Sequence, residues 1–94
     1  MKPMASREIY LEITYRRGKP LAGYLHLPRK KGSKAVRSKK FAQGLVVDFD
    51  EGDEPIGVEI TSPSQVSLES MNAVLNELHL RGIGRQELAP LVAG

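Results

Sequence analysis

The most concentrated chemical signal in the sequence is positive charge between positions 29 and 40. Seven of these twelve residues are basic, namely Arg29, Lys30, Lys31, Lys34, Arg37, Lys39 and Lys40. Basic side chains that reach phosphates release counterions, so the segment can bind nucleic acid without choosing a sequence. No aromatic residue lies within the segment to stack on bases. The same composition is also typical of a solvated connection, or of an edge strand that its lysines protect from aggregation.

A second cluster is acidic. It contains Asp48, Asp50, Glu51, Asp53 and Glu54. A calcium loop presents oxygen ligands at alternate positions and ends on a distant Glu, but here Gly52 stands where the third ligand belongs. The pattern therefore predicts an acidic hairpin turn and no metal site.

Catalytic and cofactor signatures are weak. Cysteine is absent, which excludes disulfides, thiolate catalysis and Cys-based zinc sites. His26 and His79 are the only imidazoles, and they are isolated from each other in the sequence. No serine has a nucleophile-elbow context, and Gly82-Ile83-Gly84 lacks the spacing of a dinucleotide loop. We expect a protein that is not an enzyme and holds no cofactor.

Alternating apolar residues in 9–15 and 21–27 predict a first β-hairpin. A three-residue turn at 17–19 would keep the apolar side chains of both strands on one face. The resulting pairs are Tyr15 with Leu21, Leu11 with Leu25, Glu12 with Tyr24, and Tyr10 with His26.

The same alternation in 45–49 and 56–60 predicts a second hairpin with a four-residue turn. Its pairs are Phe49 with Ile56, Val47 with Val58, Leu45 with Ile60, Asp48 with Gly57, and Val46 with Glu59. A glycine inside a strand marks a bulge or the close approach of another group, so Gly57 is a position to examine.

An amphipathic helix is predicted over 66–81, with Ser67 as its N-cap and Gly82 as its left-handed C-terminal cap. Its apolar stripe consists of Leu68, Met71, Val74, Leu75 and Leu78. Residues 85–94 form a short helical turn or tail that Pro90 limits. The predicted fold is a single α+β domain over 1–94. In it, two hairpins within 7–61 (about four strands), joined by the basic connection 29–40, form an antiparallel sheet covered on one face by the helix.

Charge is distributed unevenly along the chain. Residues 1–40 contain twelve basic and two acidic residues, whereas residues 41–94 contain two basic and nine acidic ones. The basic part can face a polyanionic partner. Alternatively, the two parts can attract each other within one chain or between two copies.

The sheet face opposite the helix carries Tyr10, Tyr24, His26 and Val46. Tyr is enriched where protein surfaces meet, and an uncovered antiparallel sheet is a natural site for a two-fold dimer. The alternative is a partly solvated sheet face. We expect a homodimer that uses these four residues.

The run from Gly44 to Ile60 resembles the signature of a bacterial family, the domain of unknown function 2283. The matching positions are Asp48, Phe49, Asp50, Gly57 and Glu59. The first hairpin departs from the family pattern, because basic Arg16-Arg17-Gly18-Lys19 stands where an acidic turn is usual. The resemblance implies a fold and a bacterial origin but no activity.

The sequence as a whole predicts a small cytoplasmic interaction module that self-associates, as an antitoxin-like or regulatory partner of another small bacterial protein. The alternative is a nucleic-acid-binding protein that uses the basic segment 29–40. No stretch approaches the ~20 apolar residues of a membrane span, and the N-terminus has no apolar leader, so we expect no membrane association.

Overall fold

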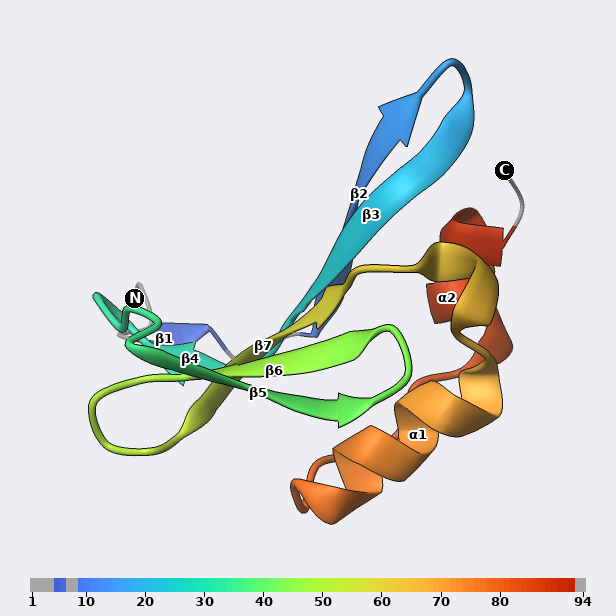
Figure 1. Cartoon of the computed structure of the whole chain (residues 1–94). Helices are drawn as coiled ribbons and strands as arrows, with labels where there is room; N and C mark the ends of the chain where they lie inside the picture. The colour runs from blue at the N-terminus through green and yellow to red at the C-terminus, as the bar shows by residue number, and fades with distance from the viewer. Residues whose placement is uncertain (1–4, 7–8, 93–94) are drawn as a thin grey trace.

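A five-stranded antiparallel sheet is the main element of the computed structural model, which describes residues 5–6 and 9–92 (Figure 1). Its strands, in spatial order, are β2 (Tyr10–Arg16), β3 (Lys19–His26), β7 (Pro55–Ile60), β6 (Leu45–Phe49) and β5 (Arg37–Ala42). Two short strands, β1 (Ala5–Ser6) and β4 (Arg29–Lys30), pair separately. β7 is therefore the central strand that joins the first hairpin to the second.

The α+β class and the antiparallel sheet are confirmed, but the predicted strand number is wrong. The fifth strand, β5, comes from the second part of the basic segment 29–40, which also contains β4. Half of this segment, residues 29–30 and 37–40, is therefore in strands, as in the edge-strand alternative, and residues 31–36 form the connection between them. Residues 7–8 and 93–94 of the predicted elements lie outside the described residues.

The first hairpin keeps its predicted register by a different route. Leu11 pairs with Leu25, Glu12 with Tyr24, and Tyr10 with His26, as expected. The turn itself has two residues, Arg17 and Gly18, and both have positive φ, at 53° and 79°. Tyr15 pairs with Pro20 instead of Leu21, which becomes the extra residue of a bulge. The two-residue turn and the one extra residue at the bulge together place three residues out of register, as a three-residue turn would, so the strand pairs below the bulge are the predicted ones.

The second hairpin repeats this solution. Four predicted pairs are present, namely Val47 with Val58, Leu45 with Ile60, Asp48 with Gly57, and Val46 with Glu59. Phe49 pairs with Pro55, so the predicted pair with Ile56 is wrong and Ile56 is the bulged residue. Ile56 is nevertheless buried, because a bulge re-aims a side chain without removing it from the core.

Helix α1 (Leu68–Glu77) is shorter than the predicted span 66–81. Ser67 caps it as predicted, in a reciprocal capping box with Ser70. The predicted cap at Gly82 is wrong. His79 takes the left-handed position with φ of 61°, and the Leu80 N–H donates to the Leu75 carbonyl at 2.9 Å, which closes a Schellman motif.

Helix α2 (Arg85–Val92) is a full helix where a turn or tail was expected. The chain returns toward it through Ile83, whose backbone N–H and carbonyl both bond to the side chain of Asn72, at 2.7 and 3.0 Å. The Glu87 carboxylate accepts from the Gly84 N–H and pairs with Arg81 at 3.1 Å, and these contacts lower the pKa of Glu87. A short η1 turn (Pro63–Gln65) precedes α1.

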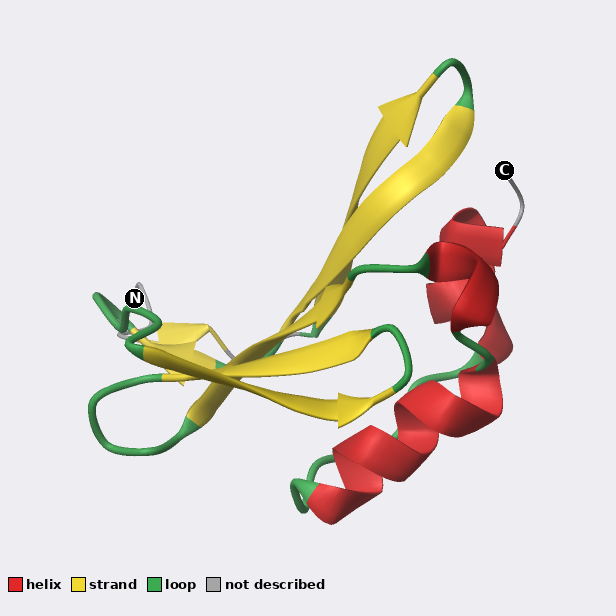
Figure 2. Ribbon diagram, viewed as in Figure 1, coloured by secondary structure: helices red, strands yellow, loops and turns green. Residues whose placement is uncertain are grey.

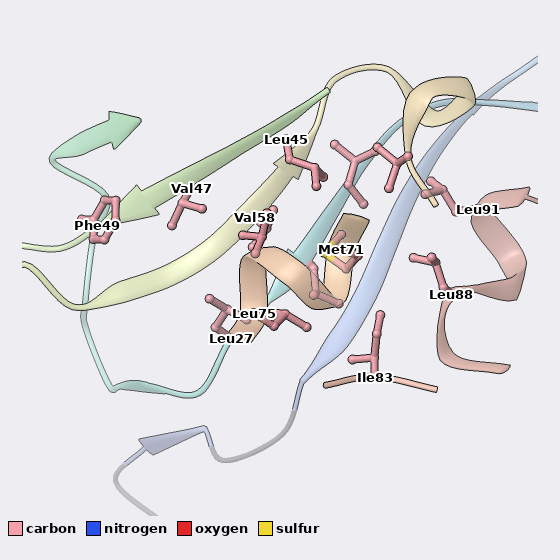
Figure 3. Close-up of a cluster of buried hydrophobic side chains, with 14 residues drawn as sticks. Leu27, Leu45, Val47, Phe49, Val58, Met71, Leu75, Ile83, Leu88 and Leu91 are labelled. Carbon is pink, nitrogen blue, oxygen red and sulfur yellow. The ribbon is translucent and has the colours of Figure 1, made fainter. Parts of the chain in front are cut away.

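The core joins one side of the sheet to both helices (Figures 2 and 3). It includes Leu25, Leu45, Val47, Val58 and Ile60 from the strands, and Met71, Val74, Leu75, Leu88 and Leu91 from the helices. Two helices therefore contribute where one was expected. The strand side chains on the other side of the sheet, among them Tyr10, Tyr24, His26 and Asp48, do not belong to this cluster.

The left-handed His79 yields a stability prediction. Replacing His79 by Gly should raise the free energy of unfolding by about 0.5–1 kcal/mol, because Gly adopts this conformation without a Cβ clash. The matched control is Ala73→Gly in the same helix, which should lower it by about 1 kcal/mol. Urea denaturation measures both, and a loss of stability in the two variants alike would contradict the assignment of the cap.

Candidate functional site

The strand registers align the side chains of the sheet's outer face, the face away from the core cluster, in two rows. The first row contains Tyr10, His26, Gly57, Asp48 and Ser38, and the second contains Glu12, Tyr24, Glu59, Val46 and Lys40. Each row crosses all five strands in the order β2, β3, β7, β6, β5. All four residues predicted as an interaction face, Tyr10, Tyr24, His26 and Val46, lie in these rows.

The central contact of the outer face is a hydrogen bond from the Tyr24 hydroxyl to Oδ2 of Asp48, at 2.9 Å. These residues lie on β3 and β6, so the tyrosine ring must cross β7 to make the contact. Gly57 permits the crossing, because a Cβ at this position would collide with the hydroxyl and ring carbons of Tyr24. Of the two alternatives predicted at Gly57, a bulge or a close approach, the close approach holds at Gly57 itself, and the approaching group is Tyr24. The bulge lies at the neighbouring Ile56.

Asp48 is a polar residue that the fold has buried, with only 7% of its surface exposed. Its Oδ1 accepts a second hydrogen bond, from the Ser38 hydroxyl at 2.6 Å. A buried carboxylate is costly unless its oxygens have partners, and Tyr24 and Ser38 supply them. Burial and the hydrogen bond to Asp48 raise the pKa of Tyr24 well above its ordinary value, which keeps its hydroxyl a donor.

Glu59 lies next to this carboxylate and interacts with it. Interaction with the Asp48 carboxyl group and burial together raise the pKa of Glu59. Two adjacent carboxyl groups favour sharing one proton, because ionising both brings like charges together. The charge at the centre of the outer face therefore depends on pH.

A second network surrounds His26. Its Nε2 lies 2.6 Å from Oε1 of Glu12, and its Nδ1 lies 3.3 Å from Nη2 of Arg29. Arginine can only donate, so Nδ1 accepts from Arg29 and Nε2–H donates to Glu12. The Tyr10 ring stacks on the imidazole at 4.2 Å between centroids, and the Tyr24 ring meets it edge-on at 4.8 Å. The predicted packing of Tyr10 against His26 is confirmed.

These contacts define what the arrangement can do chemically. The Ser38 hydroxyl donates to the Asp48 carboxylate, and the His26 imidazole is held between Glu12 and Arg29, so the serine and the histidine belong to separate contacts. Among residues 5–6 and 9–92, no three His, Cys, Asp or Glu side chains gather to hold a metal ion. Fixed aromatic rings and fixed charges on an open face are typical of a recognition surface.

The residues of the family motif have distinct places in the structure. Asp48, Gly57 and Glu59 meet beneath and beside the Tyr24 ring. Asp50 shapes the β6–β7 turn, where its Oδ1 accepts from the Gly52 and Glu54 N–H groups at 2.9 and 3.0 Å. Phe49 lies at the end of the core.

The basic segment lies beside the acidic turn. Lys30, Lys31, Ser33 and Lys34 line a hollow of about 420 Å³ together with Asp50 and Glu51. Arg37 pairs with Asp53 at 2.8 Å and also covers the Phe49 ring at 4.3 Å, and Arg29 contacts His26. Lys39 and Lys40 remain exposed on β5. Part of the charge asymmetry is therefore balanced within the chain.

Three members of the outer-face networks, Ser38, Arg29 and Glu12, were not predicted to belong to this face as site residues. Ser38 was read only as part of the basic segment, and its facing toward Asp48 follows once β5 is paired with β6. Arg29 was predicted only as a nucleic-acid contact. Glu12 was predicted to pair with Tyr24, and its approach to His26 was considered only as what an enzyme would need. The predicted pairing of Glu12 with Tyr24 already placed this carboxylate one diagonal step from His26.

The chain matches no family model, no curated protein and no solved structure. The resemblance to the domain of unknown function 2283 family therefore stays a prediction that rests on its motif. None of the helices within 9–92 has the length and apolar character needed to cross a membrane.

The crossing of Tyr24 over Gly57 can be tested by a double-mutant cycle. Gly57→Ala should lower the free energy of unfolding by about 2–4 kcal/mol, since Tyr24 must move and the buried Asp48 loses a donor. In a Tyr24→Ala background the same substitution should change stability by less than about 0.5 kcal/mol. An equal loss in both backgrounds would show that Gly57 is needed for another reason.

The carboxyl pair predicts a pH dependence. The pKa of Glu59 in the native state is raised above the ordinary value of 4.5. Its contribution to the free energy of unfolding is therefore fully present below pH 4.5, and it is lost as the pH rises through the native pKa. Glu59→Gln should remove this loss, so above the native pKa of Glu59 the variant should be more stable than the wild type by about 0.5–1 kcal/mol. The effect is modest because the site is partly solvated. Urea midpoints across this pH range measure it.

The control is Glu51→Gln in the exposed β6–β7 turn, which removes the same charge away from Asp48. The pH profile of this control should follow that of the wild type. If Glu59→Gln instead lowers stability at neutral pH, the two carboxyl groups do not oppose each other.

Proposed function

We propose that the protein is a non-enzymatic interaction module that self-associates through the outer face of its sheet. The supporting observation is the placement of opposite charges at the two ends of one row. Glu12 lies on the edge strand β2 with 70% of its side chain exposed, and Lys40 lies on the other edge strand, β5. A surface with this arrangement is complementary to a second copy of itself.

The complementarity specifies a symmetry axis. A two-fold axis parallel to the central strand β7 reverses the order of the strands and preserves the rows. Glu12 of one copy then faces Lys40 of the other at both ends of the interface. Along the same row Tyr24 faces Val46, and in the other row Tyr10 faces Ser38. Such an arrangement is an isologous face-to-face sandwich.

The aromatic residues support the same proposal. Tyr10 leaves 51% of its surface exposed, yet its ring is already held against His26. Held side chains lose little conformational freedom on binding, which lowers the entropic cost of association.

A charge-swap experiment tests the dimer and its symmetry. Glu12→Lys and Lys40→Glu should each weaken self-association about tenfold or more, because like charges then face each other twice. Mixing the two variants should restore association, since in the mixed dimer both ends pair opposite charges. Sedimentation over a micromolar-to-millimolar concentration series measures each case. Glu12→Gln keeps an acceptor for His26, so it separates the effect of the charge from the effect of that hydrogen bond.

Two results would overturn the proposal. The first is a wild-type protein that stays monomeric throughout the series. The second is a mixture that associates no better than its components, which would exclude the stated axis. Circular dichroism of each variant confirms that the fold is retained.

The proposal of a further protein partner rests only on the motif that resembles a bacterial family. The resemblance to a bacterial family supports a cytoplasmic setting and a small regulatory or antitoxin-like role, in which the dimer presents its remaining surfaces to another protein. A nucleic-acid role for the basic segment is the second candidate. It is favoured by the exposure of six of its side chains, namely Lys30, Lys31, Lys34, Arg37, Lys39 and Lys40.

A further inference from the structure

The tip of the first hairpin extends beyond the rest of the sheet. β3 pairs with β7 only over Gly23–His26, so its earlier residues, from Lys19 to Ala22, pair with β2 alone. Figure 1 shows β2 and β3 leaving the other strands as a two-stranded ribbon. The ribbon begins at Gly23, where the side chains of Ile60 and Leu91 would lie 3.2 Å from an added Cβ. Its base is therefore packed, whereas its tip is unsupported.

The tip has a composition that the core does not explain. Between Tyr15 and Leu21 there are three basic residues, Arg16, Arg17 and Lys19, and no acidic residue. Tyr15 and Leu21 are 52% and 51% exposed. No ion pair or side-chain hydrogen bond within 9–92 engages the three cations. In the basic segment 29–40, by contrast, the two arginines have partners, since Arg37 pairs with Asp53 and Arg29 contacts His26. Its five lysines form no ion pair within 9–92.

The turn places a charged residue, Arg17, in a backbone conformation that is unfavourable for it. Arg17 and Gly18 both have positive φ, the geometry of a two-residue turn for which Asn-Gly or Asp-Gly is strongly preferred. An arginine at the first position is less stable than Asn, Asp or Gly would be. Its guanidinium lies at the far end of the ribbon, where it contributes nothing to the packing of the fold. Such a residue is best explained by an external contact.

We propose that this ribbon tip, residues 15–21, binds the phosphate backbone of double-stranded nucleic acid by entering a groove. Two paired strands lie ~4.8 Å apart, and the B-DNA major groove, ~12 Å wide, admits a two-stranded ribbon. The three cations then reach the phosphates on the groove walls, and Tyr15 supplies a hydroxyl for a further phosphate contact. Binding through these phosphate contacts is independent of sequence, because phosphates carry no base identity.

The ribbon site is separate from the outer face proposed for self-association. The ribbon residues lie beyond the part of β3 that pairs with β7. The two rows of the outer face end on β2 at Tyr10 and Glu12, which are outside the ribbon tip. A dimer about the β7 axis would carry two such ribbons, so duplex binding would strengthen on dimerisation without depending on it.

The test compares two variants with the same change in net charge. Binding of the full-length protein to a fluorescein-labelled duplex of ~20 base pairs is measured by anisotropy between ~50 and ~200 mM NaCl. The ribbon variant replaces Arg16, Arg17 and Lys19 by Gln. The matched control replaces Lys30, Lys31 and Lys34 by Gln.

The ribbon variant should bind at least about tenfold more weakly, and the slope of log K against log salt should flatten by about 2–3, close to one for each phosphate that is no longer neutralised. The control should keep the wild-type slope to within about one. A second variant, Arg17→Asn, keeps or improves the turn geometry. It should bind more weakly while its thermal midpoint is unchanged or higher, so weaker binding cannot be attributed to unfolding.

Several outcomes would overturn the proposal. If both triple variants weaken binding equally, net charge alone is responsible. If only the control fails to bind, the basic segment 29–40 is the nucleic-acid site. If poly-L-glutamate displaces the duplex as well as unlabelled duplex does, or if phosphatidylserine vesicles bind while duplex does not, the ribbon recognises another anionic partner. The oligomeric state, measured separately, shows whether the proposed function holds independently.

Discussion

The carboxylate of Asp48 constrains the outer face more than any other group. It is nearly buried on the side of the sheet that the helices do not cover, so its oxygens must find donors among neighbouring strands. One donor, Ser38, comes from β5, and the other, Tyr24, comes from β3 across the central strand. A single charged group thereby connects four of the five strands, and it requires glycine at position 57 of the strand between.

The same requirement arranges the aromatic residues. Tyr24 is drawn toward Asp48, and its ring meets His26 edge-on. His26 is in turn fixed by Glu12, Arg29 and the stacked ring of Tyr10. The outer face is thus a connected network in which aromatic area and charge are placed together. Surfaces held in this way bind with little reorganisation, which favours recognition over catalysis.

Much of the fold could be predicted from the alternation of apolar residues alone. The alternation determines which side chains of a strand face the core, and this holds even where the length of the turn is predicted wrongly. Both hairpin registers were correct although both predicted tips were wrong, since the bulges at Leu21 and Ile56 replaced the expected turn lengths. β5 has no apolar alternation to detect. Arg37 lies over the Phe49 ring at 4.3 Å and Lys39 over Phe41 at 5.7 Å, so cations occupy positions where the pattern requires apolar residues.

The candidate site was harder to predict than the fold for a related reason. Parity placed Tyr10, Tyr24 and His26 on one face, but the partners that orient them lie on other strands and become visible only through the sheet order. Gly82 was the natural choice of helix cap by residue type, yet Asn72 bonds the neighbouring Ile83 backbone and would be crowded by a Cβ at Gly82, at 2.9 Å from its Oδ1. Gly82 is therefore explained by packing, and the left-handed cap falls to His79.

The distribution of charge gains a different meaning once the chain is folded. The acidic turn and the basic loop lie beside each other, so the segment with most cations has part of its charge balanced locally. The cations of the β2–β3 turn lie at the end of a ribbon with no acidic residue between Tyr15 and Leu21. Electrostatic attraction to a polyanion depends mainly on the charges that have no partner within the chain, and less on the number of basic residues in a run. The three cations on the projecting ribbon have no acidic residue among their sequence neighbours, whereas Lys30, Lys31 and Lys34 share a hollow with Asp50 and Glu51, so the ribbon presents its charge to a polyanion with less local compensation.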